Sequence, residues 1–189
     1  GTAITAGNTI SVDATTTMQD VIDKINTLLP DSTASLREDG KIKIVDNTTG
    51  YSRTDINMSY TSSSGGTDSL RMPGYFEIIT AGGNEVKNVN ITVVDSQGGK
   101  HTFNAAFVRT DTDNTWDMVL ASVTGNVSEL TDRRIEGIEF GISGAFNGLS
   151  DPAESTSFGI RFAHDPSSTQ TIGVSMGTVN NFDGLTQFS

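Results

Sequence analysis

The sequence predicts a mainly β protein in two parts, which are a small α+β module over residues 1–73 and an all-β domain over residues 74–189. Only one segment, near the N-terminus, has the apolar spacing of a helix. From residue 75 onward, short alternating segments are separated by turns rich in Gly, Asp and Asn, a pattern typical of an antiparallel sandwich or barrel. Ser and Thr make up about a quarter of the chain, and β-branched and small polar residues favour exposed strands.

The first module is expected to begin with a strand and a helix. Residues 9–12 alternate polar and apolar side chains, which predicts a strand. The segment TTTMQDVIDKINTLLP then predicts an amphipathic helix. Thr17 and Asp20 have the spacing of a capping box, and Pro30 ends the helix. The apolar stripe of the helix consists of Met18, Val21, Ile22, Ile25, Leu28 and Leu29.

A hairpin follows in the segment TASLREDGKIKIVD, with its turn at Asp39-Gly40. We expect the helix to cover one face of this small sheet. Residues 62–66 are Ser and Gly without apolar content, which predicts a linker and places the domain boundary between there and Pro73-Gly74.

The second domain is predicted to contain at least six strands and no helix. Alternation and turn residues predict strands at 89–93, 101–108, 116–120, 135–140, 157–162 and 171–176. Turns are expected at 95–99 and 110–114.

Net charge limits the expected partners, and cysteine content limits the expected cross-links. The net charge of −11 and the isoelectric point near 4.4 exclude nucleic acid and anionic membranes as expected partners, because like charges repel. The absence of cysteine excludes disulfides and fits both cytosolic proteins and proteins exported unfolded through a narrow channel. We find no apolar run of transmembrane length and no signal peptide, and the opening Gly1-Thr2 predicts a piece of a longer protein.

Two motifs could carry chemistry, and each has a simpler interpretation. Residues 173–177 match G-x-S-x-G, but a hydrolase elbow needs a following helix and a later histidine, so we interpret them as a strand. Asp111, Asp113 and Asn114 could bind calcium, but the glycine and glutamate of an EF-hand loop are missing. A polar turn is the favoured interpretation there, and whether a metal binds is left open.

The remaining candidates are isolated residues. His101 and His164 lack partners at metal-ligand spacing, so no metal and no cofactor is expected. Trp116, the single tryptophan, is predicted to anchor the core. Arg133-Arg134 is expected in a solvated turn or as a salt-bridge donor. Since no acid, base, nucleophile or metal set converges, the sequence predicts a protein that is not an enzyme.

Two stretches resemble the bacterial flagellar hook protein family over roughly residues 86–189. The first, residues 91–120, has a D-S-x-G turn, a histidine-bearing strand, a polar turn and an N-x-W strand. The second is NNFDGLTQFS at residues 180–189. The residues that carry the resemblance are Asp95, Ser96, Gly98, His101, Phe107, Val108, Asn114, Trp116, Phe182, Asp183, Gly184, Leu185 and Phe188. The N-terminal segment is similar to the "hook IN" module of flagellins, filament caps and some hook proteins.

The resemblance implies a structural subunit of the hook, the flexible tube that links the motor and rod to the filament. Its expected location is the extracellular flagellum, reached by unfolded export without a cleaved signal peptide. Its expected partners are other copies of the subunit in a helical tube, together with hook-associated and rod proteins. The chain lacks the heptads of the family's polymerising ends, so it is expected to be a surface-facing outer part that is monomeric alone. The aromatic residues of the last stretch are expected to pack within the subunit, some of them covered by a neighbour.

Other functions stay open. A distal rod, filament or cap component would share the general features of the family. A surface adhesin that binds carbohydrate is the alternative from another class, and it would require a pocket lined by exposed aromatic side chains. An enzyme is the alternative with the least support.

Overall fold

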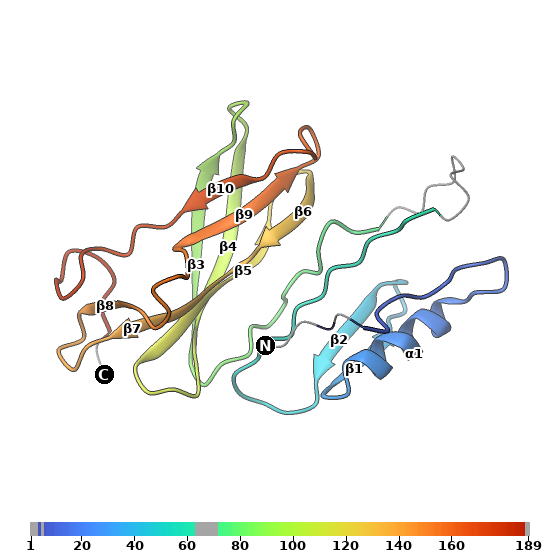
Figure 1. Cartoon of the computed structure of the whole chain (residues 1–189), viewed down its shortest axis with the longest axis horizontal. Coiled ribbons are helices and arrows are strands. Elements are labelled where there is room, and N and C mark those ends of the chain that lie inside the picture. The colour runs from blue at the N-terminus through green and yellow to red at the C-terminus, as the bar shows by residue number, and fades with distance from the viewer. Residues whose placement is uncertain (1–3, 5, 63–71, 188–189) are drawn as a thin grey trace. The chain divides into compact units, whose positions relative to one another are not determined.

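The computed structural model describes Ile4, residues 6–62 and residues 72–187 (Figure 1). The chain forms two compact units, Gly1–Thr54 and Asp55–Ser189. The described part is mainly β with one short helix, which confirms the predicted fold class, and its antiparallel sheets do not close into a barrel. The domain boundary at 73/74 stays a prediction, and residues 63–66 of the expected linker lie outside the described residues.

The first unit is a helix packed on a two-stranded antiparallel sheet. It contains α1 (Met18–Leu28), β1 (Ser32–Leu36) and β2 (Ile42–Asp46). The predicted capping box is present, since Thr17 and Asp20 bond reciprocally at the helix N-terminus. Ile22 and Ile25 of the helix are buried, and so is Ala34 of β1. The helix, its cap and the hairpin were therefore predicted correctly.

The expected strand at residues 9–12 is absent from the described part of this unit. Alternation alone does not make a strand, because the ladder needs a neighbouring strand to accept its backbone hydrogen bonds. β1 and β2 pair only with each other in this sheet, and Val12 is 52% exposed.

The second unit contains eight strands in the described residues, arranged in two antiparallel sheets. The larger sheet has the order β3-β4-β5-β7-β8, and the smaller has the order β10-β9-β6. The strands are β3 (Val86–Val94), β4 (Lys100–Arg109), β5 (Thr115–Val123), β6 (Val127–Asp132), β7 (Arg134–Phe140), β8 (Phe146–Leu149), β9 (Ser157–Phe162) and β10 (Gln170–Gly173).

All six predicted strands of this unit exist, but one is shorter and two more were missed. β10 ends at Gly173 instead of residue 176, opposite Ser157 where its partner β9 begins, and one further backbone hydrogen bond joins Val174 N to Thr156 O. β6 has one buried residue and two register shifts, so its alternation is obscured. β8 is only four residues long.

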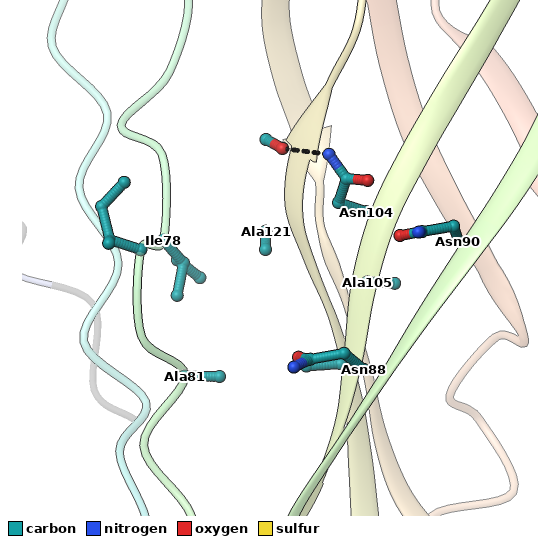
Figure 2. A pocket seen from close by; sticks show the side chains of 10 residues that line it. Ile78, Ala81, Asn88, Asn90, Asn104, Ala105 and Ala121 are labelled. Atoms are coloured by element: carbon teal, nitrogen blue, oxygen red, sulfur yellow. Dashed lines mark hydrogen bonds between the residues drawn. The ribbon is translucent and has the colours of Figure 1, made fainter.

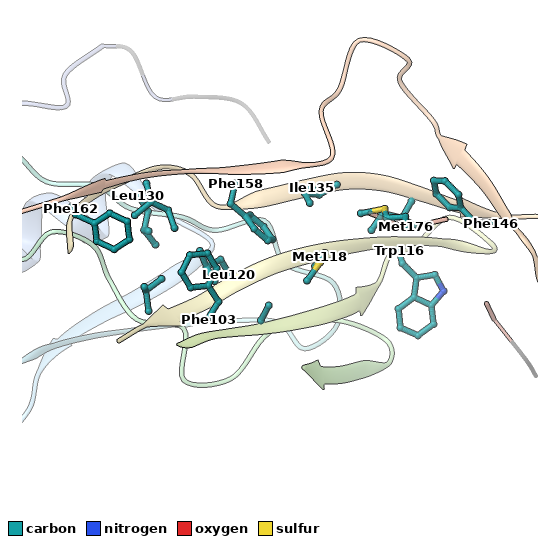
Figure 3. Packing of buried hydrophobic residues seen from close by; sticks show 14 residues of the cluster. Phe103, Trp116, Met118, Leu120, Leu130, Ile135, Phe146, Phe158, Phe162 and Met176 are labelled. Carbon is teal, nitrogen blue, oxygen red and sulfur yellow. The ribbon is translucent and has the colours of Figure 1, made fainter. Parts of the chain in front are cut away.

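The core of this unit lies between the two sheets, as in a sandwich. Phe103, Met118 and Leu120 come from the larger sheet, and Phe158 and Phe162 come from the smaller one. Figure 3 shows these side chains meeting between the strands. Each is 1% exposed or less, so the alternate residues of β4, β5 and β9 provide one continuous apolar layer.

The opposite face of the larger sheet is also partly covered. Val108 and Val119 are buried there although they point away from the core between the sheets. The chain before β3 runs along this face, with a backbone hydrogen bond from Ile78 N to Ala121 O and another from Asn84 N to Arg109 O. Both faces of β4 and β5 are therefore buried in their central part, which explains why β5 is apolar at most positions.

Candidate functional site

The D-S-x-G turn forms a compact loop between β3 and β4. Asp95 Oδ1 accepts hydrogen bonds from the backbone N–H groups of Gln97 and Gly99, each at 2.8 Å. Gly98 has a φ of +85°, in the left-handed region where a side chain would be strained. The motif therefore encodes a tight turn in which an aspartate replaces missing backbone partners.

His101 is bound on both sides of its ring. Its Nε2 lies 2.8 Å from Asp95 Oδ2, and its Nδ1 lies 2.8 Å from the carbonyl oxygen of Thr124. The hydrogen bond from His101 lowers the pKa of Asp95 to about 2. Burial by itself would lower the pKa of His101, but the bonds to Asp95 and Thr124 outweigh burial and raise that pKa. Asp95 and His101 were selected as signature residues from the sequence, and the structure brings them into direct contact.

Trp116 is buried on β5, with 7% of its surface exposed, and its indole N–H donates to Gln187 Oε1 at 3.0 Å. This confirms that Trp116 lies in the core. The same bond ties the last described residues of the chain to the larger sheet. Thr186 forms an isolated antiparallel bridge with Ala145, and Gln187 N donates to Gly144 O.

The loop of residues 176–185 is closed by hydrogen bonds to Asp183 and by one very close backbone approach, at Gly184. Asp183 accepts hydrogen bonds from the backbone N–H and the hydroxyl of Thr178, and these bonds lower its pKa. A Cβ atom at Gly184 would lie 2.2 Å from the carbonyl oxygen of Met176, so only glycine fits there. The D-G pair of the F-D-G-L-T-Q-F stretch therefore closes this loop.

The apolar residues of this stretch do not all pack inside the unit. Leu185 is half-buried and contacts the core cluster. Phe182 is 60% exposed, so it does not pack inside this unit as expected, and its cover by a neighbouring subunit stays a prediction. The loop closes through its backbone and Asp183, which leaves the Phe182 ring outside. Phe188 lies outside the described residues.

Arg133 has a structural role that no sequence pattern indicated. Its side chain is 5% exposed, which contradicts the solvated-turn interpretation. The guanidinium donates to the carbonyl oxygens of Leu120, Ala121 and Phe76, and it pairs with Asp55 Oδ1 at 3.0 Å.

The neighbouring arginine, Arg134, is partly buried and forms the predicted kind of salt bridge. Arg134 Nη1 lies 3.1 Å from Oδ2 of Asp117, a carboxylate that is almost completely buried. A basic pair in an acidic chain indicates carboxylate partners, but the pattern does not identify Asp55 and Asp117 as those partners.

A shallow groove of about 250 Å³ lies on the outer face of the larger sheet (Figure 2). Its floor carries Asn88, Asn90 and Asn104, and Asn104 Nδ2 donates to Ser122 Oγ at 2.8 Å. Ile78 and Ala81 form the other wall, together with the 83% exposed Ile79. The lining contains neither charged nor aromatic side chains, so it offers neutral hydrogen bonding and no acid or base.

The remaining candidate motifs show no converging chemistry in the described residues. In the G-x-S-x-G match, Gly173 ends β10 and residues 174–177 follow without regular secondary structure, so the strand expected there stops early; no helix follows in the described residues. Asp111 accepts a hydrogen bond from Asn84. In the part of the chain that the structure describes, no group of three or more His, Asp and Glu side chains is placed to hold a metal ion. The one helix there is too short to cross a membrane.

Comparison with known proteins gives one family. The profile of the family described as "Flagellar basal body protein FlaE D2 domain" matches residues 73–189, more than half of the chain. Searches of curated proteins and of solved structures give no match. The matched range contains the D-S-x-G turn, His101, Trp116 and the F-D-G-L-T-Q-F stretch.

Proposed function

Because the chain belongs to the family of the flagellar basal body protein FlaE D2 domain, a hook-type structural component of the flagellum, we propose that it is an outer part of the hook subunit. The hook is the flexible tube that joins the rod to the filament. The observation that carries this proposal is the family match over residues 73–189. The tight turn at Asp95 and the closed loop at Asp183 support a role in shape and not in chemistry.

The proposed mechanism is mechanical. Outer domains of neighbouring subunits touch along the lattice of the tube, and these contacts change as the tube bends while it rotates. Large apolar patches would fix such contacts, whereas neutral polar surfaces allow them to break and form again. The outer face with Asn88, Asn90, Asn104 and Ser122 is a surface of this second kind. In a chain with a net charge of −11, an uncharged face also lets two copies approach with less repulsion.

The proposal places the protein in the extracellular flagellum, after unfolded export without a cleaved signal peptide. Its partners are other copies of the subunit, the hook-associated proteins and the rod. The chain alone is expected to sediment as a monomer at micromolar and millimolar concentration, with or without calcium. A stable dimer or a calcium response would favour an adhesin instead and would point to Asp111 and Asp113.

The decisive experiment is immunogold electron microscopy with antibodies raised against this chain, on flagella isolated with their basal bodies. Labelling confined to the short curved tube is the expected result. Labelling of the rod, along the filament or at its tip would assign the chain to one of those components. Labelling of the surface of cells that lack flagella would replace the proposal with an adhesin. An adhesin has less support, because the groove lining contains no aromatic side chain and Trp116 is buried.

A matched pair of variants tests the role of the neutral face. Asn90→Trp places a bulky ring on an exposed position of β3, and Asn90→Ser keeps a small neutral side chain there. In the full-length subunit, the tryptophan variant is expected to alter hook curvature and reduce swimming, while the serine variant is expected to do neither. Hooks of normal shape and swimming of normal speed with Asn90→Trp would contradict a contact at this face.

A further inference from the structure

The hydrogen bonds of His101 define its protonation state. The Thr124 carbonyl oxygen can only accept a hydrogen bond, so the Nδ1 atom 2.8 Å away must carry a hydrogen. Asp95 Oδ2 lies 2.8 Å from Nε2, and the pKa of this carboxyl is held near 2, so the group is ionised and also only accepts. Nε2 must therefore carry a hydrogen too. An imidazole with hydrogens on both nitrogens is an imidazolium cation.

The His101 cation lies in a narrow and largely buried site. The side chains of His101 and Asp95 are 10% and 5% exposed, so water cannot substitute freely for a lost partner. The Phe162 ring of β9 lies 4.3 Å from the imidazole between ring centroids, a distance at which an aromatic ring also attracts a cation. On the other side, a Cβ atom at Gly125 would lie 2.6 Å from Nδ1, so the slot is narrow.

The ring joins two turns that belong to different parts of the sandwich. Asp95 lies in the turn between β3 and β4 of the larger sheet. Thr124 lies in the connection from β5 of the larger sheet to β6 of the smaller sheet. A second bond, from Gln170 Nε2 on β10 to Ser96 Oγ, ties the same β3–β4 turn to the smaller sheet. His101 therefore sits where one end of the sandwich is held together.

We propose that His101 is a pH-sensitive link between the two turns. As an imidazolium it donates a hydrogen bond to each turn, and when it loses a proton one of these bonds is lost and this end of the sandwich opens. A neutral imidazole has only one N–H group. After deprotonation, either the Thr124 carbonyl or the Asp95 carboxylate must face a lone pair inside a buried slot. That repulsion is relieved by opening one of the turns.

Few other groups can alter this titration. The β5–β6 turn contributes the backbone of Thr124 and Gly125. β9 contributes the apolar Phe162, and the exposed His164 stacks on that ring at 5.6 Å between centroids. Lys100 precedes His101 on β4, so its side chain points to the opposite face of the sheet. Within the described residues, Asp95 is the charged side chain that bonds the His101 ring.

The sign of the pH effect follows from linkage. The pKa of His101 is raised above its ordinary 6.5 in the folded chain, so its stabilising contribution is complete below pH 6.5. This contribution is lost as the pH rises through the folded-state pKa. Asp95 acts in the opposite direction, since its lowered pKa gives a contribution that is lost only as the pH falls from 3.8 toward 2.

Nitrogen-15 NMR of the imidazole rings in the whole chain tests the proposal, because His101 and His164 are the only two histidines. The expected spectrum at pH 6 shows both ring nitrogens of His101 protonated, with a midpoint of titration above 6.5. Each unit by which that midpoint exceeds 6.5 is expected to raise the unfolding equilibrium constant about tenfold at high pH. The protection of the Gln97 and Gly99 amides against exchange, relative to unprotected amides at the same pH, is expected to fall over the same pH range.

Two variants provide the controls. His101→Gln is expected to abolish the pH dependence of unfolding between pH 6 and 9, and His164→Gln is expected to keep it. A neutral His101 at pH 6, or a midpoint at or below 6.5, would overturn the proposal, as would loss of the pH dependence in His164→Gln. The spectrum of the unaltered chain decides the matter if His101→Gln does not fold.

Discussion

Arg133→Met is expected to lower the free energy of unfolding of the second unit by about 3–5 kcal/mol. The substitution keeps much of the apolar stem of the side chain and removes the guanidinium. That group is 5% exposed and bonds to the carbonyl oxygens of Leu120, Ala121 and Phe76. It thereby holds the chain before β3 against the larger sheet.

The magnitude follows from the acceptors that lose their donor. A buried polar group left without a partner costs about 1–3 kcal/mol, and Arg133 donates to the carbonyl oxygens of Leu120 and Phe76, while Ala121 O keeps its bond from Ile78 N. The ion pair with Asp55 adds little, because that carboxylate is 48% exposed and solvent screens it. A loss of about 3–5 kcal/mol is a large share of the about 5–15 kcal/mol that stabilises a typical domain.

Urea unfolding followed by tryptophan fluorescence measures this loss. Trp116 is the single tryptophan and lies in the core of the second unit, so its signal reports on that unit. Lys87→Met is the matched control within the same unit, because the Lys87 side chain is 68% exposed and pairs with Glu85 on the surface. It should change the unfolding free energy by less than about 0.5 kcal/mol. Asp55→Asn should cost less than about 1 kcal/mol.

A cost below about 1 kcal/mol for Arg133→Met would refute the reasoning. It would mean that water or a small backbone movement satisfies these carbonyl groups without the guanidinium. Arg133→Lys separates charge from geometry, because lysine keeps the charge but cannot reach several acceptors with one planar group. A lysine variant as stable as the unaltered chain would show that charge alone is needed.

Three further predictions concern the ends of the fold. Gly184→Ala should destabilise the second unit by about 1–3 kcal/mol, because its Cβ would lie 2.2 Å from Met176 O. Urea unfolding measures this loss, and an unchanged unfolding midpoint would contradict the close approach. Thr17→Ala removes the helix cap and should cost the first unit about 1 kcal/mol, seen as earlier loss of the helical circular dichroism signal with unchanged Trp116 fluorescence. Gln187→Leu removes the hydrogen-bond acceptor of the Trp116 N–H. It should shift the tryptophan emission and lower the free energy of unfolding by about 1 kcal/mol. An unchanged emission spectrum would show that this bond does not form in solution.

Local signals predicted the first unit well. The capping box at Thr17, the apolar stripe around Ile22 and Ile25 and the Asp39-Gly40 turn involve residues close in sequence, and each feature is present. The strand expected at residues 9–12 failed for the opposite reason, since a strand exists only where another strand pairs with it.

Among the signature residues of the second unit, local contacts were again predicted and long-range contacts were not. The D-S-x-G turn is local, and its aspartate does cap the turn. The bond from its other carboxylate oxygen to His101 depends on the register of β3 against β4. The contact of His101 with Thr124 depends on the register of β4 against β5. Similarly, the sequence did not reveal that Trp116 donates to Gln187, 71 positions later.

Sequence patterns were enough to predict the fold class, the helix, the hairpin and most of the strands, because periodicity, caps and turns act between near neighbours. The resemblance of residues 91–120 and 180–189 to the flagellar hook family is borne out by the family match over residues 73–189. Long-range packing produced three features that no local pattern indicated: the burial of Arg133, the exposure of Phe182 and the hydrogen bonds on both sides of His101. Those outcomes depend on which distant backbone groups lack partners after the sheets have packed, and side-chain type alone does not encode them.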